Sequence, residues 1–377
     1  MLLTAVCLAV FYSGESQGFA GNRLIELRDS DSVWSGKLVA MDRRTCVIFD
    51  RMGEMHRLPI RTLTSFERVA EQYRPLSISE FRGQLLKEFP KGYEVAGTSH
   101  YLVCGPKGKA QTYAQLFESV YRSVDSYYRV RGFDLTSPDT PLVAIVFGTQ
   151  AEFASYCRRD KMSFSPTLRG YYSLQTNRIA LYDDPRLVSQ TDSGEKQIPD
   201  LDDTESLLAA FGLSGQTAGT IIHETTHQVS YNIGIHSRAG VTPTWLCEGL
   251  ATLLEAPGIR KTTGTRTRSS RTNSERLEWF RLKYMPRRQN GDLTRLVTSD
   301  QFFRSQTLDA YSFSWAFTFF LAENPTYTRK FTRYLKTVSE RDPMSDYAAV
   351  QRVRDFSDAF GDVAQLEVEF LRFMDRL

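Results

Sequence analysis

Two histidines and a glutamate stand close together at positions 223–227. Residues 221–228 read Ile-Ile-His-Glu-Thr-Thr-His-Gln, so His223 and His227 stand four residues apart. On a helix this spacing places both imidazoles on one face, where they can bind one zinc ion. Glu224 lies beside His223 and could take a proton from a metal-bound water. The motif predicts a metal site with a general base. The alternative is a helix with two solvated histidines, and the apolar pair before His223 disfavours it.

A second segment offers the third protein ligand that a catalytic zinc site usually has. Residues 243–255 read Pro-Thr-Trp-Leu-Cys-Glu-Gly-Leu-Ala-Thr-Leu-Leu-Glu. They predict a helix that begins near Pro243, because proline is favoured in a first helical turn. Glu248 falls in an otherwise apolar stretch, where burying an unpaired carboxylate would be costly. A metal ion would remove that cost, so Glu248 is the candidate third ligand.

Together the two segments resemble a known family. HETTH followed by WLCEGLA is similar to the gluzincin metallopeptidases, and above all to the WLxEGxA signature of the aminopeptidase N-like and related families. The chain also resembles uncharacterised secreted bacterial domains of this superfamily. The resemblance extends from about Tyr93 to Val338, and its specific part is the two helix motifs. Residues 22–70 are not covered by it.

The resemblance implies a thermolysin-like zincin domain that hydrolyses peptides or proteins through a metal-activated water. It implies one Zn2+ per chain, Glu224 as general base, and the metal ligands His223, His227 and Glu248. Gluzincins commonly stabilise the oxyanion with a downstream Tyr or His, which makes Tyr311 the second candidate catalytic residue. The alternative for Tyr311 is an aromatic side chain that only packs.

The supporting residues of the site differ between subfamilies. Thr252 stands where thermolysin-like members have an acid, so the groups around the ligands must differ from theirs. Glu255 matches an acid common in the aminopeptidase-like signature, and it is expected either to support a ligand or to end the helix in solvent. A metzincin site is disfavoured, because Ile233 stands where that family has its third histidine. His236 is interpreted as a loop residue.

Two other functions remain open from the sequence. The chain could be a non-catalytic binding or structural module on a metallopeptidase scaffold, since a fold does not by itself establish an activity. The presence of Glu224 argues against this, because a purely structural metal site does not require it. The chain could also be a zinc hydrolase that acts on a bond other than a peptide bond. The basic run between Arg260 and Arg271 is interpreted as a solvated loop.

Composition sets limits on the class of protein. Of the 377 residues, 41% are hydrophobic and 24% are charged, which is ordinary for a globular protein with a sizeable core. The net charge of +3 gives no general reason to expect nucleic-acid binding. No internal segment has the roughly 20 apolar residues that span a bilayer, so no transmembrane segment is expected.

The chain is predicted to divide into four parts. Residues 1–20 resemble a signal peptide, with an apolar stretch and small residues up to Ala20, although no Lys or Arg precedes Arg23. A secreted, periplasmic or cell-envelope location follows, and a buried terminal strand or helix is the alternative. Residues 21–70 have the short alternating segments of a small all-β, SH3-like unit, and residues 71–92 form a linker.

The remaining part, residues 93–377, is the predicted catalytic domain. Strand-like segments precede residue 183 and helical patterns dominate from Leu207 onward, which indicates an α+β fold with a mixed sheet and a mostly helical C-terminal half. Residues 170–173 and 178–182 predict a hairpin. Its second strand is expected to be either the sheet edge that borders a substrate cleft or an ordinary interior strand.

Overall fold

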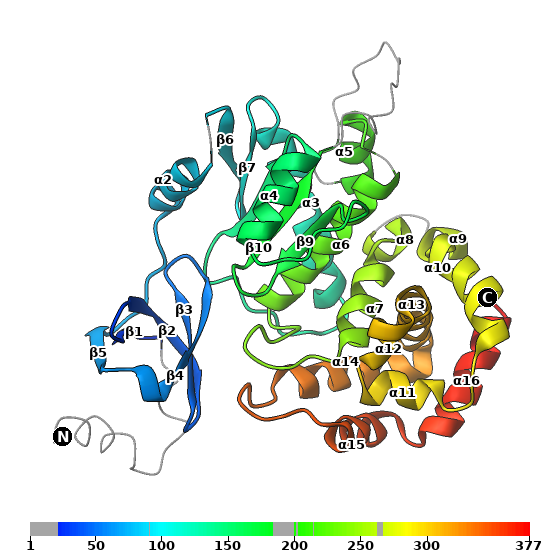
Figure 1. Cartoon of the computed structure of the whole chain (residues 1–377). Coiled ribbons are helices and arrows are strands. Elements are labelled where there is room, and N and C mark those ends of the chain that lie inside the picture. Colours follow the sequence, from blue (N-terminus) through cyan, green and yellow to red (C-terminus); the bar gives the residue numbers. More distant parts are fainter. Residues whose placement is uncertain (1–21, 90, 184–199, 201–202, 214, 262–266) are drawn as a thin grey trace.

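The chain is an α+β protein with two five-stranded sheets, and about half of its residues are helical (Figure 1). The computed structural model describes residues 22–89, 91–183, 200, 203–213, 215–261 and 267–377. The predicted signal peptide lies outside these residues. No described helix combines the length and the apolar character that crossing a membrane requires. The described cysteines are buried and form no disulfide: Cys46, Cys104, Cys157 and Cys247.

The first sheet is antiparallel, with the strand order β4-β3-β2-β1-β5. Its strands are β1 (Leu24–Arg28), β2 (Val33–Met41), β3 (Thr45–Asp50), β4 (Met55–Pro59) and β5 (Ser65–Ala70), with the 3-10 turn η1 (Ile60–Thr62) before β5. Alternate side chains such as Ile25 and Leu27 point inward, as the period of two along a strand requires. They form a small core of their own with Leu38, Ile48 and Leu58.

The second sheet is mixed and has the order β6-β7-β8-β10-β9. Its strands are β6 (Tyr93–Gly97), β7 (Tyr101–Pro106), β8 (Leu142–Phe147), β9 (Gly170–Ser173) and β10 (Arg178–Tyr182). β8 pairs in parallel with β7 and β10, and the outer pairs are antiparallel. The hairpin is confirmed, and Asn177 accommodates its turn with a φ of 58°. Because β9 folds back along β10, β10 is the interior strand and β9 is the edge.

Helices cover both faces of the second sheet. Alternate residues of β8 point to opposite sides, so Ala144 and Val146 pack with α3 (Ala110–Arg129), while Ile145 and Phe147 face the other way. That other face carries α2 (Ile78–Glu88) and α4 (Gln150–Arg159). The parallel strands are apolar on both faces because both are covered, as is usual for parallel pairing.

The C-terminal half is helical and wraps around one central helix (Figure 1). Its elements are α5 (Thr204–Ala210), α6 (Gly215–Asn232), α7 (Thr244–Leu254), α8 (Pro257–Arg260), α9 (Arg268–Arg271), α10 (Ser274–Trp279), the π-helical turn η3 (Phe280–Tyr284), the 3-10 turn η4 (Met285–Arg287), α11 (Asp292–Thr298), α12 (Gln301–Ser305), α13 (Thr307–Glu323), α14 (Pro325–Ser339), α15 (Ala349–Phe360) and α16 (Val363–Asp375). The central helix is α13, which is buried nearly all round, as expected of a helix that is apolar on every side.

Gly249 lets α7 and α13 approach closely. A Cβ atom at this position would lie 2.1 Å from Oγ1 of Thr318 and 2.9 Å from the carbonyl oxygen of Ser314. Both distances are shorter than van der Waals contact, and the carbonyl oxygen belongs to the backbone of α13. Only glycine therefore permits this helix spacing, which brings α7 and α13 together beside Glu248.

The first sheet is docked on the rest of the chain through a buried arginine. Arg238, only 6% exposed, donates to the carbonyl oxygens of Gly53 and Leu174 at 2.9 and 2.8 Å. Its guanidinium also lies 4.5 Å from the ring centroid of Phe49. Leu174 belongs to the turn between β9 and β10, so this contact ties the small sheet to the edge of the large one.

We predict that Gly249→Ala destabilises the protein and that Gly83→Ala does not. The first change forces α7 away from α13, and overpacking of this kind costs about 1–3 kcal/mol. Gly83 lies in α2, and a Cβ atom added there would have no neighbouring atom within 4 Å, so alanine should add up to about 1 kcal/mol of helix stability. The free energy of unfolding from urea denaturation measures both effects. Equal values for the two variants would contradict the close-packing argument.

Candidate metal centre

The predicted HExxH segment lies on α6, which is anchored to both sheet and helices. Ile221 and Val229 are fully buried on α6 in the main core. Gln228 is also fully buried, and its amide donates to the carbonyl oxygens of Val143 and Asn177 at 3.0 and 2.7 Å. These bonds attach α6 to β8 and to the start of β10. They fix the rotation of the helix and hence the direction in which the neighbouring His227 points.

Three candidate ligand atoms converge on one point. Nε2 of His223 lies 3.1 Å from Nε2 of His227 and 3.2 Å from Oε2 of Glu248. The remaining separation, from His227 Nε2 to Glu248 Oε2, is 3.5 Å. Ligand atoms around a tetrahedral zinc ion with bonds of about 2.0–2.1 Å are about 3.3 Å apart. The folded chain therefore holds the three atoms at the spacing that one such ion requires.

The proton on His223 can be assigned from its outer partner. Nδ1 of His223 lies 2.8 Å from Oε1 of Glu255, and an ionised carboxylate can only accept. Nδ1 therefore carries the proton, which leaves the Nε2 lone pair pointing at the convergence point. The other oxygen of Glu255 accepts from the amide of Asn273 at 2.6 Å. Of its two predicted roles, Glu255 has the supporting one.

The site attracts positive charge. Burial opposes charging of His223, yet the hydrogen bonds with Glu248 and Glu255 raise the pKa of His223 well above its usual value. Burial also opposes ionisation of Glu248, but the two neighbouring histidines hold the pKa of Glu248 below its usual value. Without a metal, a proton on the imidazole supplies the missing charge. A bound cation would take the place of that proton.

Glu224 is oriented by the edge strand. Its Oε2 accepts a hydrogen bond of 2.8 Å from the backbone N–H of Tyr172, which lies in β9. This contact holds the Glu224 carboxylate at the edge strand of the second sheet. No sequence pattern indicated the donor, because a backbone N–H is present at almost every residue.

Tyr311 lies at the same centre, in the first turns of α13. The centroid of its ring is 6.4 Å from that of His223 and 5.5 Å from that of Phe303. Burial, followed by the nearby charges of Glu248 and Glu224, raises the pKa of Tyr311 above its usual value. The phenol therefore keeps its proton at neutral pH and can donate a hydrogen bond. The tertiary structure thus brings Tyr311 close to the candidate ligands.

Other predicted residues have structural roles. Thr252 bonds back to the carbonyl oxygen of Glu248 at 2.6 Å within α7. His236 is 3% exposed and packs against the ring of Tyr231, with centroids 5.0 Å apart.

The interpretation of the basic run between Arg260 and Arg271 as a solvated loop is wrong for its first residue, Arg260. Arg260 is buried, pairs with Glu205 and donates to the last carbonyl groups of α7, where a cation is favourable.

A second group of potential ligands lies in the first sheet. Atoms of Asp50, Glu54 and His56 lie within 4.8 Å of one another. Asp50 already accepts from the backbone N–H groups of Met52 and Glu54 at 2.8 and 2.9 Å, and pairs with His56 at 3.2 Å. These contacts close the turn between β3 and β4, and they account for the group as part of the fold.

Part of the chain matches a known protein family. Residues 217–345 match a family model described as a protein of unknown function, DUF1570. The matched range contains all the candidate ligands together with Glu224 and Tyr311, but it covers less than half of the chain. The family description assigns no activity. None of the curated proteins matches the sequence.

We predict that Glu255→Gln lowers metal affinity. The amide can no longer hold His223 through an ionised acceptor, and loss of such an outer partner typically costs 10- to 100-fold in affinity. Titration against a competing chelator measures the effect. Glu275→Gln is the matched control, because that side chain is 85% exposed on the neighbouring α10. An unchanged affinity in Glu255→Gln would contradict the assigned supporting role.

Proposed function

We propose that the protein is a zinc-dependent peptidase of the gluzincin type. The observation that carries the proposal is the convergence of two imidazole nitrogens and one carboxylate oxygen at tetrahedral spacing, beside Glu224 and a protonated tyrosine. Three protein ligands leave a fourth position open, as in catalytic zinc sites. A closed structural site would need neither Glu224 nor Tyr311.

The donor set favours zinc over other ions. Two imidazoles and one carboxylate suit a borderline metal, whereas calcium and magnesium prefer six or more oxygen ligands. A bound zinc ion would supply Lewis acidity, which polarises a carbonyl group and lowers the pKa of water. His223, His227 and Glu248 would hold it. The hydrogen bond that Nδ1 of His223 donates to Glu255 keeps His223 in the tautomer that metal binding requires.

The remaining residues have separate tasks. Glu224 takes a proton from the attacking water, holds it on its carboxylate, and then passes it to the leaving amine. Its hydrogen bond with Tyr172 keeps the carboxylate in place during this exchange. Tyr311 donates its phenolic hydrogen to the oxygen on which negative charge develops. No covalent intermediate with the protein is needed.

The edge strand β9 suits an extended substrate. β9 is antiparallel to β10 and lies beside α6, so a peptide could pair with its outer side by main-chain hydrogen bonds. This arrangement supports the zincin identity of the second sheet as part of the proposal. The SH3-like identity of the first sheet and export through residues 1–20 belong to the same proposal, and both rest on the sequence pattern.

Metal content is the first test of the proposal. We expect about one zinc per chain in the purified protein, and its loss in both His223→Ala and Glu248→Ala, because each change removes one of three ligands. Elemental analysis after gel filtration measures this. Folded wild-type protein that takes up no metal after zinc addition would overturn the proposal. Full retention in Glu248→Ala alone would move the third ligand elsewhere.

Activity is the second test. Glu224→Gln should keep the metal and lower peptide hydrolysis by about 100- to 10,000-fold, since it removes the general base. Tyr311→Phe should lower kcat by about 100- to 1,000-fold with little change in KM, because its donor acts in the transition state. A randomised peptide library with mass-spectrometric detection reads both. The controls are Glu275→Gln, at an exposed side chain, and Tyr121→Phe, at a ring that stacks on His100. Metal-loaded wild type without activity on any peptide would favour a non-catalytic module.

A further inference from the structure

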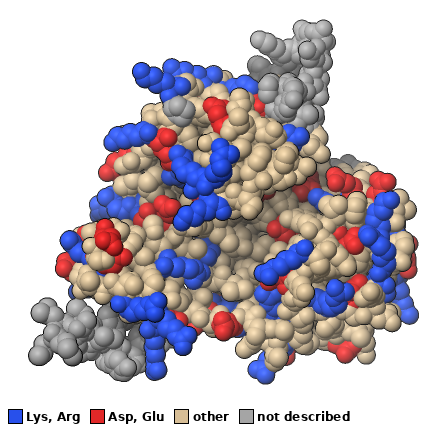
Figure 2. Space-filling model, viewed as in Figure 1, with Lys and Arg blue, Asp and Glu red and all other residues tan. Residues whose placement is uncertain are grey.

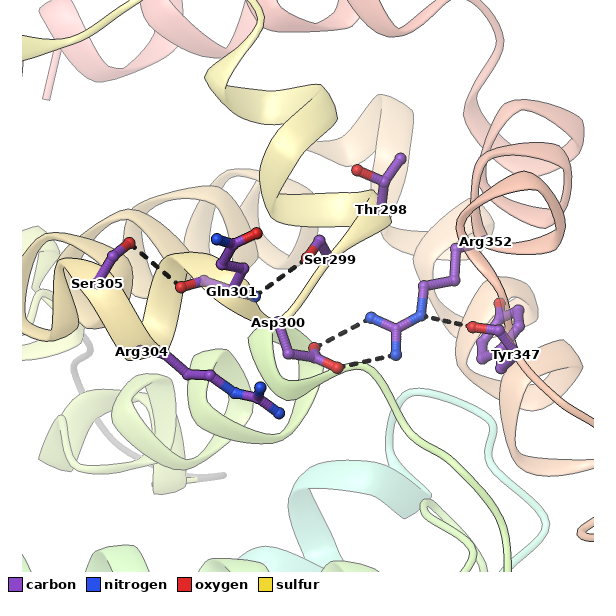
Figure 3. A pocket seen from close by; sticks show the side chains of 8 residues that line it. All are labelled: Thr298, Ser299, Asp300, Gln301, Arg304, Ser305, Tyr347 and Arg352. Carbon is purple, nitrogen blue, oxygen red and sulfur yellow. Dashed lines mark hydrogen bonds and ion pairs between the residues drawn. The ribbon is translucent and has the colours of Figure 1, made fainter.

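A pocket of about 510 Å3 lies between α12 and the region of Tyr347 and Arg352, next to the start of α7 (Figure 3). It is lined by the last residue of α11, by Ser299 and Asp300 between α11 and α12, by one face of α12, and by Tyr347 and Arg352 from the C-terminal region. All of its side chains are polar or amphipathic. The space-filling view shows a hollow between the part of the molecule that contains the two sheets and the helical C-terminal part, with Lys and Arg side chains on both of its sides (Figure 2).

The floor of the pocket is a fixed ion pair. Arg352, 6% exposed, donates to both oxygens of Asp300 at 3.0 and 2.8 Å, and to the carbonyl oxygen of Tyr347 at 3.0 Å. Asp300 also accepts from the backbone N–H of Thr244 at 2.9 Å, at the start of α7. The charge of Asp300 is thus neutralised, so the carboxylate would not repel an incoming anion strongly.

The remaining charge in the pocket belongs to Arg304. Its side chain is exposed and extends from α12 beneath Asp300, and Figure 3 draws no partner for it. Among the described residues, none pairs with its guanidinium. The Ser299 hydroxyl accepts from the N–H of Gln301 at 3.1 Å, so its own hydrogen is available to a ligand. The pocket therefore offers one net positive charge and additional neutral donors.

The pocket lies within reach of a substrate held at the metal. Phe303, the neighbour of Arg304 on α12, packs against Tyr311 with ring centroids 5.5 Å apart, and Tyr311 is 6.4 Å from His223 by the same measure. Thr244, which Asp300 contacts, precedes Glu248 by one helical turn, about 6 Å along the axis. The two ring-centroid separations together make about 12 Å, which about four residues of an extended chain span.

We propose that this pocket binds a carboxylate of the peptide substrate, with Arg304 as the pairing cation. The proposal rests on the peptidase function and names its substrate class. A planar guanidinium matches a carboxylate in a bidentate pair. A single unpaired charge suits a singly charged group better than a doubly charged phosphate. The carboxylate is either the C-terminus of the peptide or an Asp or Glu side chain a few residues from the cleaved bond.

Equilibrium binding tests the proposal without turnover. Four fluorescein-labelled hexapeptide pools, with or without acidic residues and with a free or amidated C-terminus, are titrated into the zinc-loaded Glu224→Gln protein by anisotropy. We expect Arg304→Ala and Arg304→Gln in that background to weaken the preferred carboxylate pool about 5- to 10-fold, and to leave the neutral amidated pool unchanged. Arg354→Ala, an exposed arginine of α15, is the control.

The pools identify the source of the carboxylate. Loss confined to free C-termini assigns the α-carboxylate, and loss confined to acidic pools assigns the side chain. Equal affinity of all pools, or equal loss for charged and neutral pools in Arg304→Ala, overturns the proposal.

Wild-type hydrolysis separates this result from that of the peptidase test. Cleavage with the same kcat/KM for all four pools would leave the peptidase standing and reject the pocket. Arg304-dependent binding of carboxylate pools by a protein that cleaves nothing would support the pocket and reject the peptidase.

Discussion

The structure depends on holding three electron-pair donors at one point. The three atoms are Nε2 of His223, Nε2 of His227 and Oε2 of Glu248, and they lie within 3.5 Å of one another. When neither Nε2 atom carries a proton, none of the three can donate a hydrogen bond to the other two. Bringing such groups together out of water is unfavourable unless a proton or a metal ion joins them. The packing of α6, α7 and α13 must therefore supply the free energy that keeps them in place. Two residues contribute to this packing. Gly249 has no side chain and so lets α7 lie against α13, and Gln228 attaches α6 to the sheet through hydrogen bonds.

Charged groups near the centre are held by further polar groups. Glu255 orients His223 and is itself held by Asn273, and the Arg352–Asp300 pair holds the start of α7. The same pair forms the floor of the neighbouring pocket. Because Thr244 and Glu248 lie on the same helix, a change in this ion pair should alter the position of Glu248. Arg304 takes no part in the ion pair, so its charge is available to the proposed ligand.

The two halves of the chain contribute different groups. The sheet supplies the N–H of Tyr172 that orients Glu224, and the helical half supplies Tyr311 and the third candidate ligand. The first sheet adds no group to the centre among the residues that the structure describes. Arg238 donates both to the turn that contains Gly53 in the first sheet and to the turn of the β9–β10 hairpin. The first sheet thereby supports β9, the strand that orients the proposed general base. The contacts of the first sheet are thus explained by a structural role, which is to stabilise the edge strand β9.

Features that depend on local geometry could be predicted from the sequence alone. His223 and His227 share a face because a helix repeats every 3.6 residues, and the α+β class and the hairpin follow from periodicity and turn residues. The apolar surroundings of Glu248 and a family signature both indicate this residue, whereas the resemblance alone indicates Tyr311, because no local rule connects residues on separate helices. Three features follow from the tertiary structure alone: Glu255 supports His223, β9 and not β10 is the edge, and Arg260 is buried. The same holds for the Tyr172 N–H and for the pocket at Arg304. These features arise from contacts between segments distant in sequence, and their energies depend on burial and partners that no single segment encodes.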